Sequence, residues 1–344
     1  MLDPLKTGDL VARMVMRNFR IRPSDPADLT LTGLLYLYDA TKNEEYLNHV
    51  LKVWDFRKTN NCDILDVRIY SSCLHFETWL RTGDNTFING FEAFASDWKK
   101  SIQRNSDGIV CTGSQPDNLM MSAGFLQGYC TFMSRAGFLT GNVKFFEECT
   151  RQFELSRQLH RDPSTGLWTE GKIQGFGNLL NPMSFTSRAQ GWILRGLADS
   201  IDWLPEDSVY LSRLKTIFIE LCKGLSMYQD IRGMWHQLTD HEEAYQETSG
   251  TALIVHNLYK GFHRDWLDRN PYLTIAEKAI MALIGFIRED GSVLNTGQVP
   301  SDVNKIRDYF HTPSVPGDPW SIGPALMACA GPWLAREPKS MVKS

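Results

Sequence analysis

The sequence predicts an all-α fold, an (α/α)6 barrel in which six helical hairpins close into a ring and short β-hairpins connect them. Three observations predict this fold. Amphipathic segments with apolar residues at helical spacing occur in pairs along most of the 344 residues. Similar connectors follow the pairs and carry glycines at near-regular spacing, at Gly108, Gly166, Gly233 and Gly291. No long segment alternates apolar and polar residues as a half-buried strand would.

The first three hairpins follow one plan, in which two amphipathic helices flank a short polar break. Residues 32–54 break at Ala-Thr-Lys-Asn, and Thr41 with Glu44 fits a capping box that opens the second helix. Residues 72–98 break at Arg-Thr-Gly-Asp. The third hairpin covers residues 119–159, and its apolar residues fall on one helical face: Leu119, Ala123, Leu126, Cys130 and Met133.

The fourth and fifth hairpins continue the series. The fourth covers residues 188–225. The fifth joins residues 248–262 to residues 274–287, and Thr274 with Glu277 fits a second capping box. Its first helix is apolar on more than one face, which is typical of a helix in the inner ring of a barrel.

The sixth hairpin brings the two ends of the chain together. Helix 323–335 needs a partner, and the opening helix near residues 8–19 supplies one. Because a helix pair cannot bury its apolar stripe alone, six pairs pack around a common axis. We therefore expect one domain over residues 1–336, with a tail at residues 337–344.

Composition and charge exclude several classes of protein. A net charge of −4 lacks the basic stripe that nucleic-acid binding needs, and no apolar run is long enough to cross a membrane. The seven cysteines form no CxxC pair, so buried free thiols are expected in place of disulfides or a zinc site. Residues 1–23 contain no uninterrupted apolar stretch of the secretory kind, which favours the cytoplasm. The oligomeric state is not indicated.

Candidate functional residues lie just ahead of the expected inner helices, where connectors gather and pockets form. Asp63 and Asp66 precede one helix, and Asp117 precedes another in Ser-Gln-Pro-Asp-Asn-Leu-Met-Met. An aspartate there either caps the helix or carries a proton, and both alternatives stay open for Asp117. Arg188 and Trp192 are four residues apart and share a helical face, as a cation–π pair or as sugar contacts.

The connectors add aromatic and histidine candidates. Trp168, Trp235 and Trp320 either stack on sugars or pack in the core. His236 and His241 lack the spacing of a helical metal pair, and the sequence has no HExxH, Walker loop, dinucleotide fingerprint or nucleophile elbow. We therefore expect no metal and no cofactor, and carboxylates as the proton carriers, which is the pattern of glycoside hydrolysis.

Several of these stretches resemble the unsaturated glucuronyl hydrolases and unsaturated rhamnogalacturonyl hydrolases, glycoside hydrolase families 88 and 105. The likeness runs from about residue 30 to residue 336 and keeps the order of the family motifs. The motifs are Pro-Asp-Asn-Leu-Met-Met at 116–121, Ser-Arg-Ala-Gln-Gly-Trp at 187–192, the Glu-Thr-Ser-Gly segment within 233–261, Asp-Gly-Ser-Val-Leu-Asn at 290–295 and Asp-Pro-Trp-Ser at 318–321.

The resemblance implies an (α/α)6 barrel and the hydration of an enol ether. The substrates are oligosaccharides left by polysaccharide lyases, with a 4,5-unsaturated uronic acid at the non-reducing end. Asp117 matches the acid that protonates C4, and Asp66 matches the second acidic residue, which positions substrate and donor. Arg188 and Trp192 match sugar-site positions. A donor must hold its proton near neutral pH, so the pKa of Asp117 has to rise from about 3.9 by roughly two units.

The chain departs from the family pattern at several sugar contacts. Thr186 stands where the motif begins with Trp, Glu170 where a His is usual, and Trp320 where a His is frequent. Gln115 and Pro116 precede Asp117, where family 105 commonly has Trp and an aliphatic residue. The substrate-binding set expected for this chain is Arg188, Trp192, Glu170, Gln115, Trp168, His236 and Trp320.

Two other functions remain open. A carbohydrate-binding relative without turnover is consistent with Thr186 and Glu170, because these residues alter the family's sugar contacts. A sugar epimerase on the same barrel would need histidines for its proton transfers, and His236 and His256 are the inner candidates.

Overall fold

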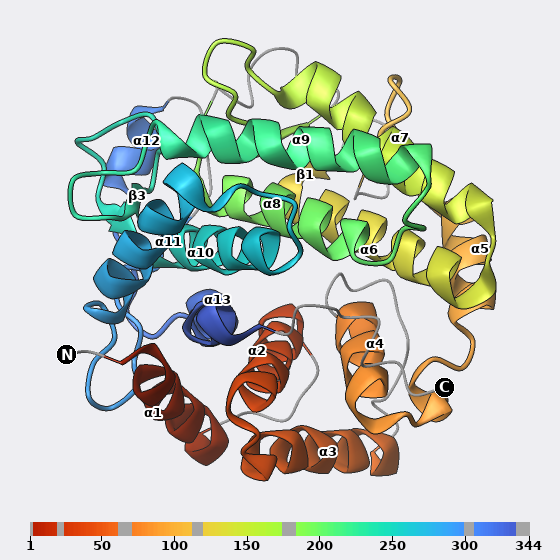
Figure 1. Cartoon of the computed structure of the whole chain (residues 1–344), viewed down its shortest axis with the longest axis horizontal. Coiled ribbons are helices and arrows are strands. Elements are labelled where there is room, and N and C mark those ends of the chain that lie inside the picture. Colours follow the sequence, from red (N-terminus) through yellow and green to blue (C-terminus); the bar gives the residue numbers. More distant parts are fainter. Residues whose placement is uncertain are drawn as a thin grey trace.

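The computed structural model describes residues 3–18, 24–60, 71–111, 120–173, 184–298 and 306–334. Within these ranges six helices form an inner ring and six others surround it (Figure 1). The inner helices are α2 (Asp25–Thr41), α4 (Ser71–Thr82), α6 (Ala123–Thr140), α8 (Ser187–Ile201), α10 (Thr248–His263) and α13 (Pro319–Ala330). The outer helices are α1 (Pro4–Asn18), α3 (Glu44–Thr59), α5 (Phe91–Ser101), α7 (Val143–His160), α9 (Val209–Ser226) and α11 (Arg269–Ile284).

Each inner helix packs against its two neighbours around the ring, and α13 closes the ring onto α2. A helix in this position is apolar on every side, and nearly all of α10 is buried, as predicted. At the closure, the backbones of α2 and α13 approach so closely that a Cβ atom at Gly33 would lie 2.8 Å from the carbonyl oxygen of Gly323. The predicted (α/α)6 barrel is confirmed.

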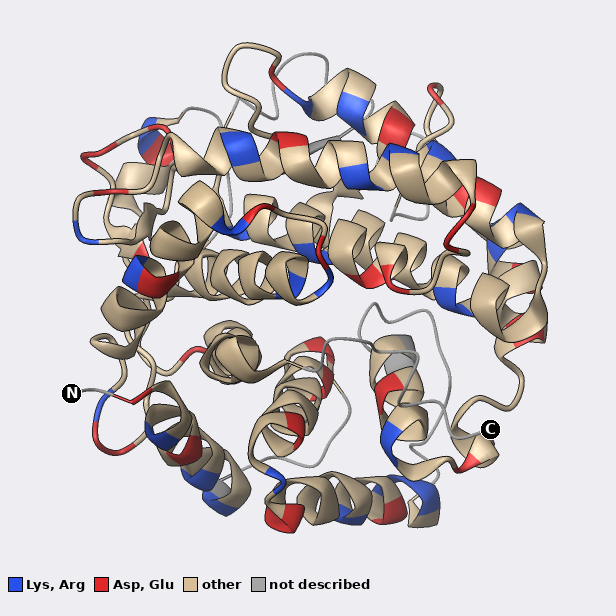
Figure 2. Ribbon diagram, viewed as in Figure 1, with Lys and Arg blue, Asp and Glu red and all other residues tan. Residues whose placement is uncertain are grey.

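The outer helices bury one face only. In α3 the buried apolar residues Tyr46, Leu47, Val50 and Trp54 keep helical spacing, and Lys, Arg, Asp and Glu cover the faces that point away from the inner ring (Figure 2). The helix α1 packs against α13, so the predicted pairing of the opening helix with the closing helix is confirmed.

Both predicted capping boxes are wrong. Asn43 is the N-cap of α3, where its side-chain oxygen accepts a hydrogen bond from the Glu45 N–H at 3.1 Å. Thr41 instead ends α2, and its hydroxyl donates to the Leu37 carbonyl four residues back, a common alternative for threonine in a helix. The helix α11 begins at Arg269, so Thr274 lies inside it.

The two ends of the barrel differ. Short turns lead from inner to outer helices at one end, which we call the turn end. Longer connectors return to the inner helices at the other, which we call the connector end, and some of them pair as the predicted hairpins. The strands β3 (Trp235–His236) and β4 (Gln246–Glu247) are antiparallel within one connector, as predicted. The strands β1 (Met120–Ser122) and β2 (Gly171–Ile173) are also antiparallel, but they join two connectors that α6 and α7 separate.

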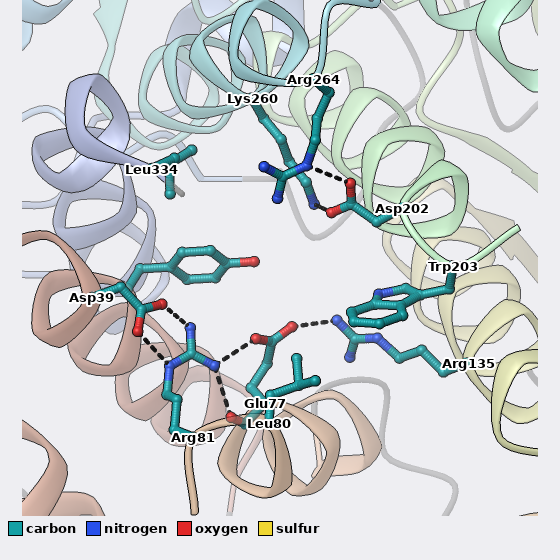
Figure 3. Close-up of a pocket in the computed structure, with 11 residues that line it drawn as sticks. Asp39, Glu77, Leu80, Arg81, Arg135, Asp202, Trp203, Lys260, Arg264 and Leu334 are labelled. Atoms are coloured by element: carbon teal, nitrogen blue, oxygen red, sulfur yellow. Dashed lines mark hydrogen bonds and ion pairs between the residues drawn. The ribbon is translucent and has the colours of Figure 1, made fainter. Parts of the chain in front are cut away.

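Ion pairs between inner helices line a small cavity at the turn end. On one side of the cavity, carboxylates and cations link α2, α4 and α6. On the other side, they link α10 to the residues that follow α8. The pairs are Asp39 with Arg81, Glu77 with Arg81 and Arg135, and Asp202 with Lys260 and Arg264 (Figure 3). Since these charges are nearly all buried and satisfied by each other, they fix the ring's geometry at this end.

No helix in the described ranges has both the length and the apolar character to cross a membrane.

Six of the cysteines lie in these ranges, and all six are free and buried. The short helix α12 (Arg307–His311) lies in the last connector, before α13.

Candidate active site

Three predicted site residues, Asp66, Asp117 and Gln115, lie outside the described residues. The described chain resumes at β1, directly ahead of α6. The N-cap of α6 is Ser122, whose hydroxyl accepts a hydrogen bond from the Phe125 N–H at 3.2 Å. Ser122 therefore fills the N-cap position of α6, whereas Asp117 itself lies outside the described residues.

Arg188 projects from the first turn of α8 at the connector end, where two neutral groups hold its guanidinium. Nε donates to the Ser249 hydroxyl at 2.8 Å, and Nη2 donates to the carbonyl oxygen of Gly297. Close packing of α8 on α10 makes this possible, since a Cβ atom at Gly250 would lie 2.3 Å from the Ser187 carbonyl carbon. Contacts with α10 and with the last connector therefore hold Arg188 at the start of α8.

Glu247 joins α8, α10 and the last connector. It is fully buried and caps α10, because its two carboxylate oxygens accept hydrogen bonds from the N–H groups of Ser249 at 2.9 Å and Gly250 at 2.6 Å. It also accepts from the Ser187 hydroxyl at 3.1 Å and the Gly297 N–H at 2.9 Å. The residues that hold Arg188 are therefore themselves held by Glu247.

Glu170 lies just ahead of β2, where two hydroxyl groups donate to one of its oxygens. Thr186 donates to Oε2 at 3.3 Å, and Tyr309 of α12 donates to the same atom at 3.1 Å. Burial raises the pKa of the Glu170 carboxyl above its usual range, although Arg188 and the two hydroxyl groups act in the opposite direction. Thr186 also caps α8 by accepting from the Ala189 N–H, so the first turn of α8 joins Glu170 and Arg188.

Two of the candidate tryptophans meet at the same end. The rings of Trp192 and Trp320 are 6.3 Å apart between centroids and inclined at 80°, an edge-to-face pair. Trp320 remains partly exposed at the start of α13. The cation over the Trp192 ring is Arg195, at 5.9 Å from the centroid, so the structure gives Arg188 other contacts than the cation–π pair considered from the sequence.

The remaining candidates have contacts of their own within the protein. Trp168 is 1% exposed and belongs to the main core, which favours packing over sugar stacking, and Trp235 is equally buried. Nδ1 of His236 faces the Ala244 carbonyl, and its Nε2 is 3.2 Å from a carboxylate oxygen of Asp230. Nδ1 therefore has a carbonyl partner, whereas the buried Nε2 lies near Asp230 without a hydrogen bond to the described chain.

His256 is poorly suited to proton transfer. It is buried within α10, its Nδ1 is 3.0 Å from the Met327 carbonyl oxygen, and its ring meets Tyr36 edge-on. Burial, and after it the charge of Lys260, lowers the pKa of His256 to about 3. At neutral pH this histidine is uncharged and its Nδ1 is bound to a carbonyl oxygen, so it could not serve as the acid that an epimerase needs.

The connector end thus unites a cation, a carboxyl group with a raised pKa and an aromatic pair. Arg188, Thr186, Glu170 and the two tryptophans were singled out from the sequence. Sequence reasoning missed Glu247, Ser249, Gly297 and Tyr309 as site residues. The Glu-Thr-Ser-Gly motif contained the signal for the first two, whereas nothing in the local sequence marks Tyr309. Within the described ranges, no three His, Cys, Asp or Glu side chains cluster as metal ligands would.

Comparison with known proteins identifies the family and the fold. A family model described as Glycosyl Hydrolase Family 88 matches residues 26–331. An unsaturated rhamnogalacturonyl hydrolase of Bacillus subtilis (strain 168), YesR, is 24% identical over 341 residues, which cover 94% of each chain.

Solved structures share the fold. A family 105 glycoside hydrolase of C. acetobutylicum ATCC 824 has a TM-score of 0.81 at 21% identity, covering 94% of this chain and 98% of its own. An unsaturated glucuronyl hydrolase of Bacillus sp. GL1 has a TM-score of 0.71 at 14% identity, covering 95% of each chain. Because the family model spans most of the sequence and the barrel matches, this chain belongs to glycosyl hydrolase family 88.

Proposed function

We propose that this protein is a glycoside hydrolase that releases a 4,5-unsaturated uronic acid from the non-reducing end of oligosaccharides left by polysaccharide lyases. The family match over residues 26–331 carries the proposal. The names of the relatives support it, since they describe hydrolases of unsaturated rhamnogalacturonyl and unsaturated rhamnoglycuronyl groups.

Asp117 is the proposed proton donor. Its carboxyl group protonates C4 of the enol ether, and positive charge develops at C5 with help from the ring oxygen. The resulting carboxylate takes a proton from water, whose oxygen bonds to C5. The hemiketal then opens, the sugar at C1 is released, and the acid is regenerated. The Ser122 cap supports this role, because α6 does not require Asp117 at its start. Asp66 is proposed to position the substrate and the donor.

Arg188 is the proposed partner of the uronate carboxylate. Its Nε and Nη2 donate to neutral acceptors, and within the described chain no carboxylate forms an ion pair with it at 4.0 Å or less. A guanidinium held in this way presents a fixed donor to an anionic ligand. Trp192 and Trp320 form the proposed apolar wall of the sugar site. Gln115, His236 and Trp168 complete the proposed substrate-binding set, with Trp168 acting from the core. Glu170 belongs to this set as the carboxyl group beside Arg188 and makes no direct contact with the sugar.

A substrate panel tests the function. Unsaturated disaccharides made by lyases from pectin, ulvan, alginate and glycosaminoglycan absorb near 235 nm, and turnover removes the double bond, so absorbance falls. We expect loss of absorbance with at least one member of the panel. Asp117→Asn should slow the reaction about 100-fold to 10,000-fold, the usual contribution of general acid catalysis, with nearly unchanged substrate affinity.

The outcome also separates the other functions. Binding of these sugars without any change in absorbance would identify a carbohydrate-binding relative and contradict the proposal. The epimerase is not favoured, because His256 is neutral and bound to a carbonyl. If Asp117→Asn retained full activity, a different acid would have to act.

We further propose that the enzyme works in the cytoplasm. The free, buried cysteines of the described ranges support this location, since disulfides are typical of oxidising compartments. Fractionation of cells that express the full-length protein checks it, and recovery from the medium would contradict it.

A further inference from the structure

Arg188 and Glu170 lie at the same rim but do not pair. Thr186, the N-cap of α8 two residues before Arg188, donates to Glu170 at 3.3 Å, so Glu170 lies at the turn that carries Arg188. The charge of Arg188 accordingly lowers the pKa of Glu170 against the effect of burial. Yet within the described chain no ion pair joins them at 4.0 Å or less, and the guanidinium binds only Ser249 and Gly297. A buried carboxylate beside a cation would normally turn to it, so something keeps this carboxylate in place.

Tyr309 supplies that restraint. Its hydroxyl donates to Oε2 of Glu170 at 3.1 Å and accepts a hydrogen bond from the Ser184 hydroxyl at 3.5 Å. Thr186 donates to the same Glu170 oxygen at 3.3 Å. Turning this oxygen to Arg188 would break both hydroxyl hydrogen bonds, and their loss offsets the gain from an ion pair. Removing one hydroxyl group lowers that cost.

The position of Tyr309 is well fixed. Its side chain is 2% exposed and packs with Leu238 and Ala244 in a small apolar cluster separate from the main core. Burial raises the pKa of Tyr309, and the neighbouring charge of Glu170 acts in the same direction, so the hydroxyl keeps its hydrogen for donation. The short helix α12 thereby presents one fixed donor to the sugar-site rim.

We propose that Tyr309 is a positioning residue that keeps Arg188 available to the substrate carboxylate by holding Glu170 away from it. This inference rests on the proposed function, since it assumes that the ligand is an unsaturated uronate. Without the Tyr309 hydroxyl, Glu170 swings to Arg188 and neutralises it. The anionic sugar then has to displace an internal carboxylate before it can bind.

Steady-state kinetics of three variants test the inference. Tyr309→Phe keeps the ring in its apolar cluster and removes only the hydroxyl. We expect KM to rise about tenfold, the effect of losing one charge-assisted hydrogen bond to substrate, and kcat to change less than about twofold. Adding Glu170→Gln to Tyr309→Phe removes the competing charge, so KM should return to near the wild-type value.

Tyr38→Phe is the matched control. The Tyr38 hydroxyl also donates to a glutamate, Glu44 at 3.3 Å, but at the turn end of the barrel. We expect its KM to equal that of the wild type. A purely structural role for Tyr309 would predict that the double variant is no better than Tyr309→Phe, because packing defects are not repaired by Glu170→Gln.

The results also separate this inference from the proposed function. A wild-type protein that consumes none of the unsaturated disaccharides overturns the proposed function. A wild type with normal turnover, together with an unchanged KM in Tyr309→Phe or an unrescued KM in the double variant, overturns the role of Tyr309 alone.

Discussion

The carboxyl group of Glu170 shows how single residues set the electrostatics of this rim. It accepts from two hydroxyl groups, it is near Arg188, and burial is the largest influence on it, raising its pKa. A raised pKa means that the folded state binds a proton more tightly than the unfolded state does. The free energy of unfolding therefore falls as pH rises from the pKa that Glu170 has in the unfolded chain to the higher pKa that it has in the folded protein.

Glu170→Gln should remove this loss of stability at high pH. We expect the melting temperature of the variant, relative to the wild type, to increase as pH is raised from 4 to 8, because glutamine still accepts from Thr186 and Tyr309 but has no charge to bury. Glu242→Gln, at an exposed position, should give no such trend. Thermal unfolding across this pH range checks it, and a difference that stays constant with pH would contradict the raised pKa.

At the scale of elements, the contact between α8 and α10 fixes the guanidinium of Arg188. Gly250 sits where the two backbones nearly touch, and the Glu247 cap locks the start of α10 to Ser187. Because glycine has no Cβ atom, the two helices can approach closely at Gly250. Side chains from both helices then reach each other, and Arg188 donates a hydrogen bond to Ser249.

Gly250→Ala should separate these helices. Its new Cβ would lie 2.3 Å from the Ser187 carbonyl carbon and 2.5 Å from the Arg188 nitrogen, both backbone atoms that cannot turn aside. We expect a loss of about 1–3 kcal/mol in the free energy of unfolding, together with a raised KM because Arg188 moves. Gly285→Ala is the control, since Gly285 has a helical φ of −68° and its one close neighbour is 3.1 Å away. Urea unfolding of both variants measures the difference, and equal stabilities would contradict the close approach.

Which elements exist was predictable from the sequence, whereas their ends were not. Apolar periodicity reports burial, so the helix pairs and the inner position of α10 were foreseen. Helix caps depend on which of several neighbouring polar residues takes the extended backbone at the first turn. Asn43, not Thr41, is the N-cap of α3, and Ser122 is the N-cap of α6. The local sequence did not show which polar residue would occupy either position.

Long-range partners were the least predictable part of the site. The motifs pointed to Arg188 and Trp192 because motif residues are close in sequence. Tyr309 reaches Glu170 from a separate connector, and no local pattern marks a contact between residues so far apart in the chain. For the same reason a connector position alone did not reveal that Trp168 is enclosed by the core.

The two ends of the barrel differ in the groups that they contain. Buried ion pairs between neighbouring inner helices fix the turn end, where Lys260 lies 2.7 Å from both Asp199 and Asp202. The connector end carries the cation and aromatic pair that suit an anionic sugar. A rigid ring with its variable connectors gathered at one mouth can retain one reaction while its sugar contacts change, which fits the departures at Thr186 and Glu170.

The central claim is that this barrel adds a proton to C4 and water to C5, with Asp117 as the acid. Running the reaction in deuterium oxide and following the released sugar by NMR from the first turnovers tests it most directly. The proposed mechanism predicts one deuterium at C4 and disappearance of the double bond. Both changes should be about 100-fold to 10,000-fold slower with Asp117→Asn. Release of a sugar that still contains its C4–C5 double bond, with no deuterium at C4, would mean displacement at the anomeric carbon and would contradict the account.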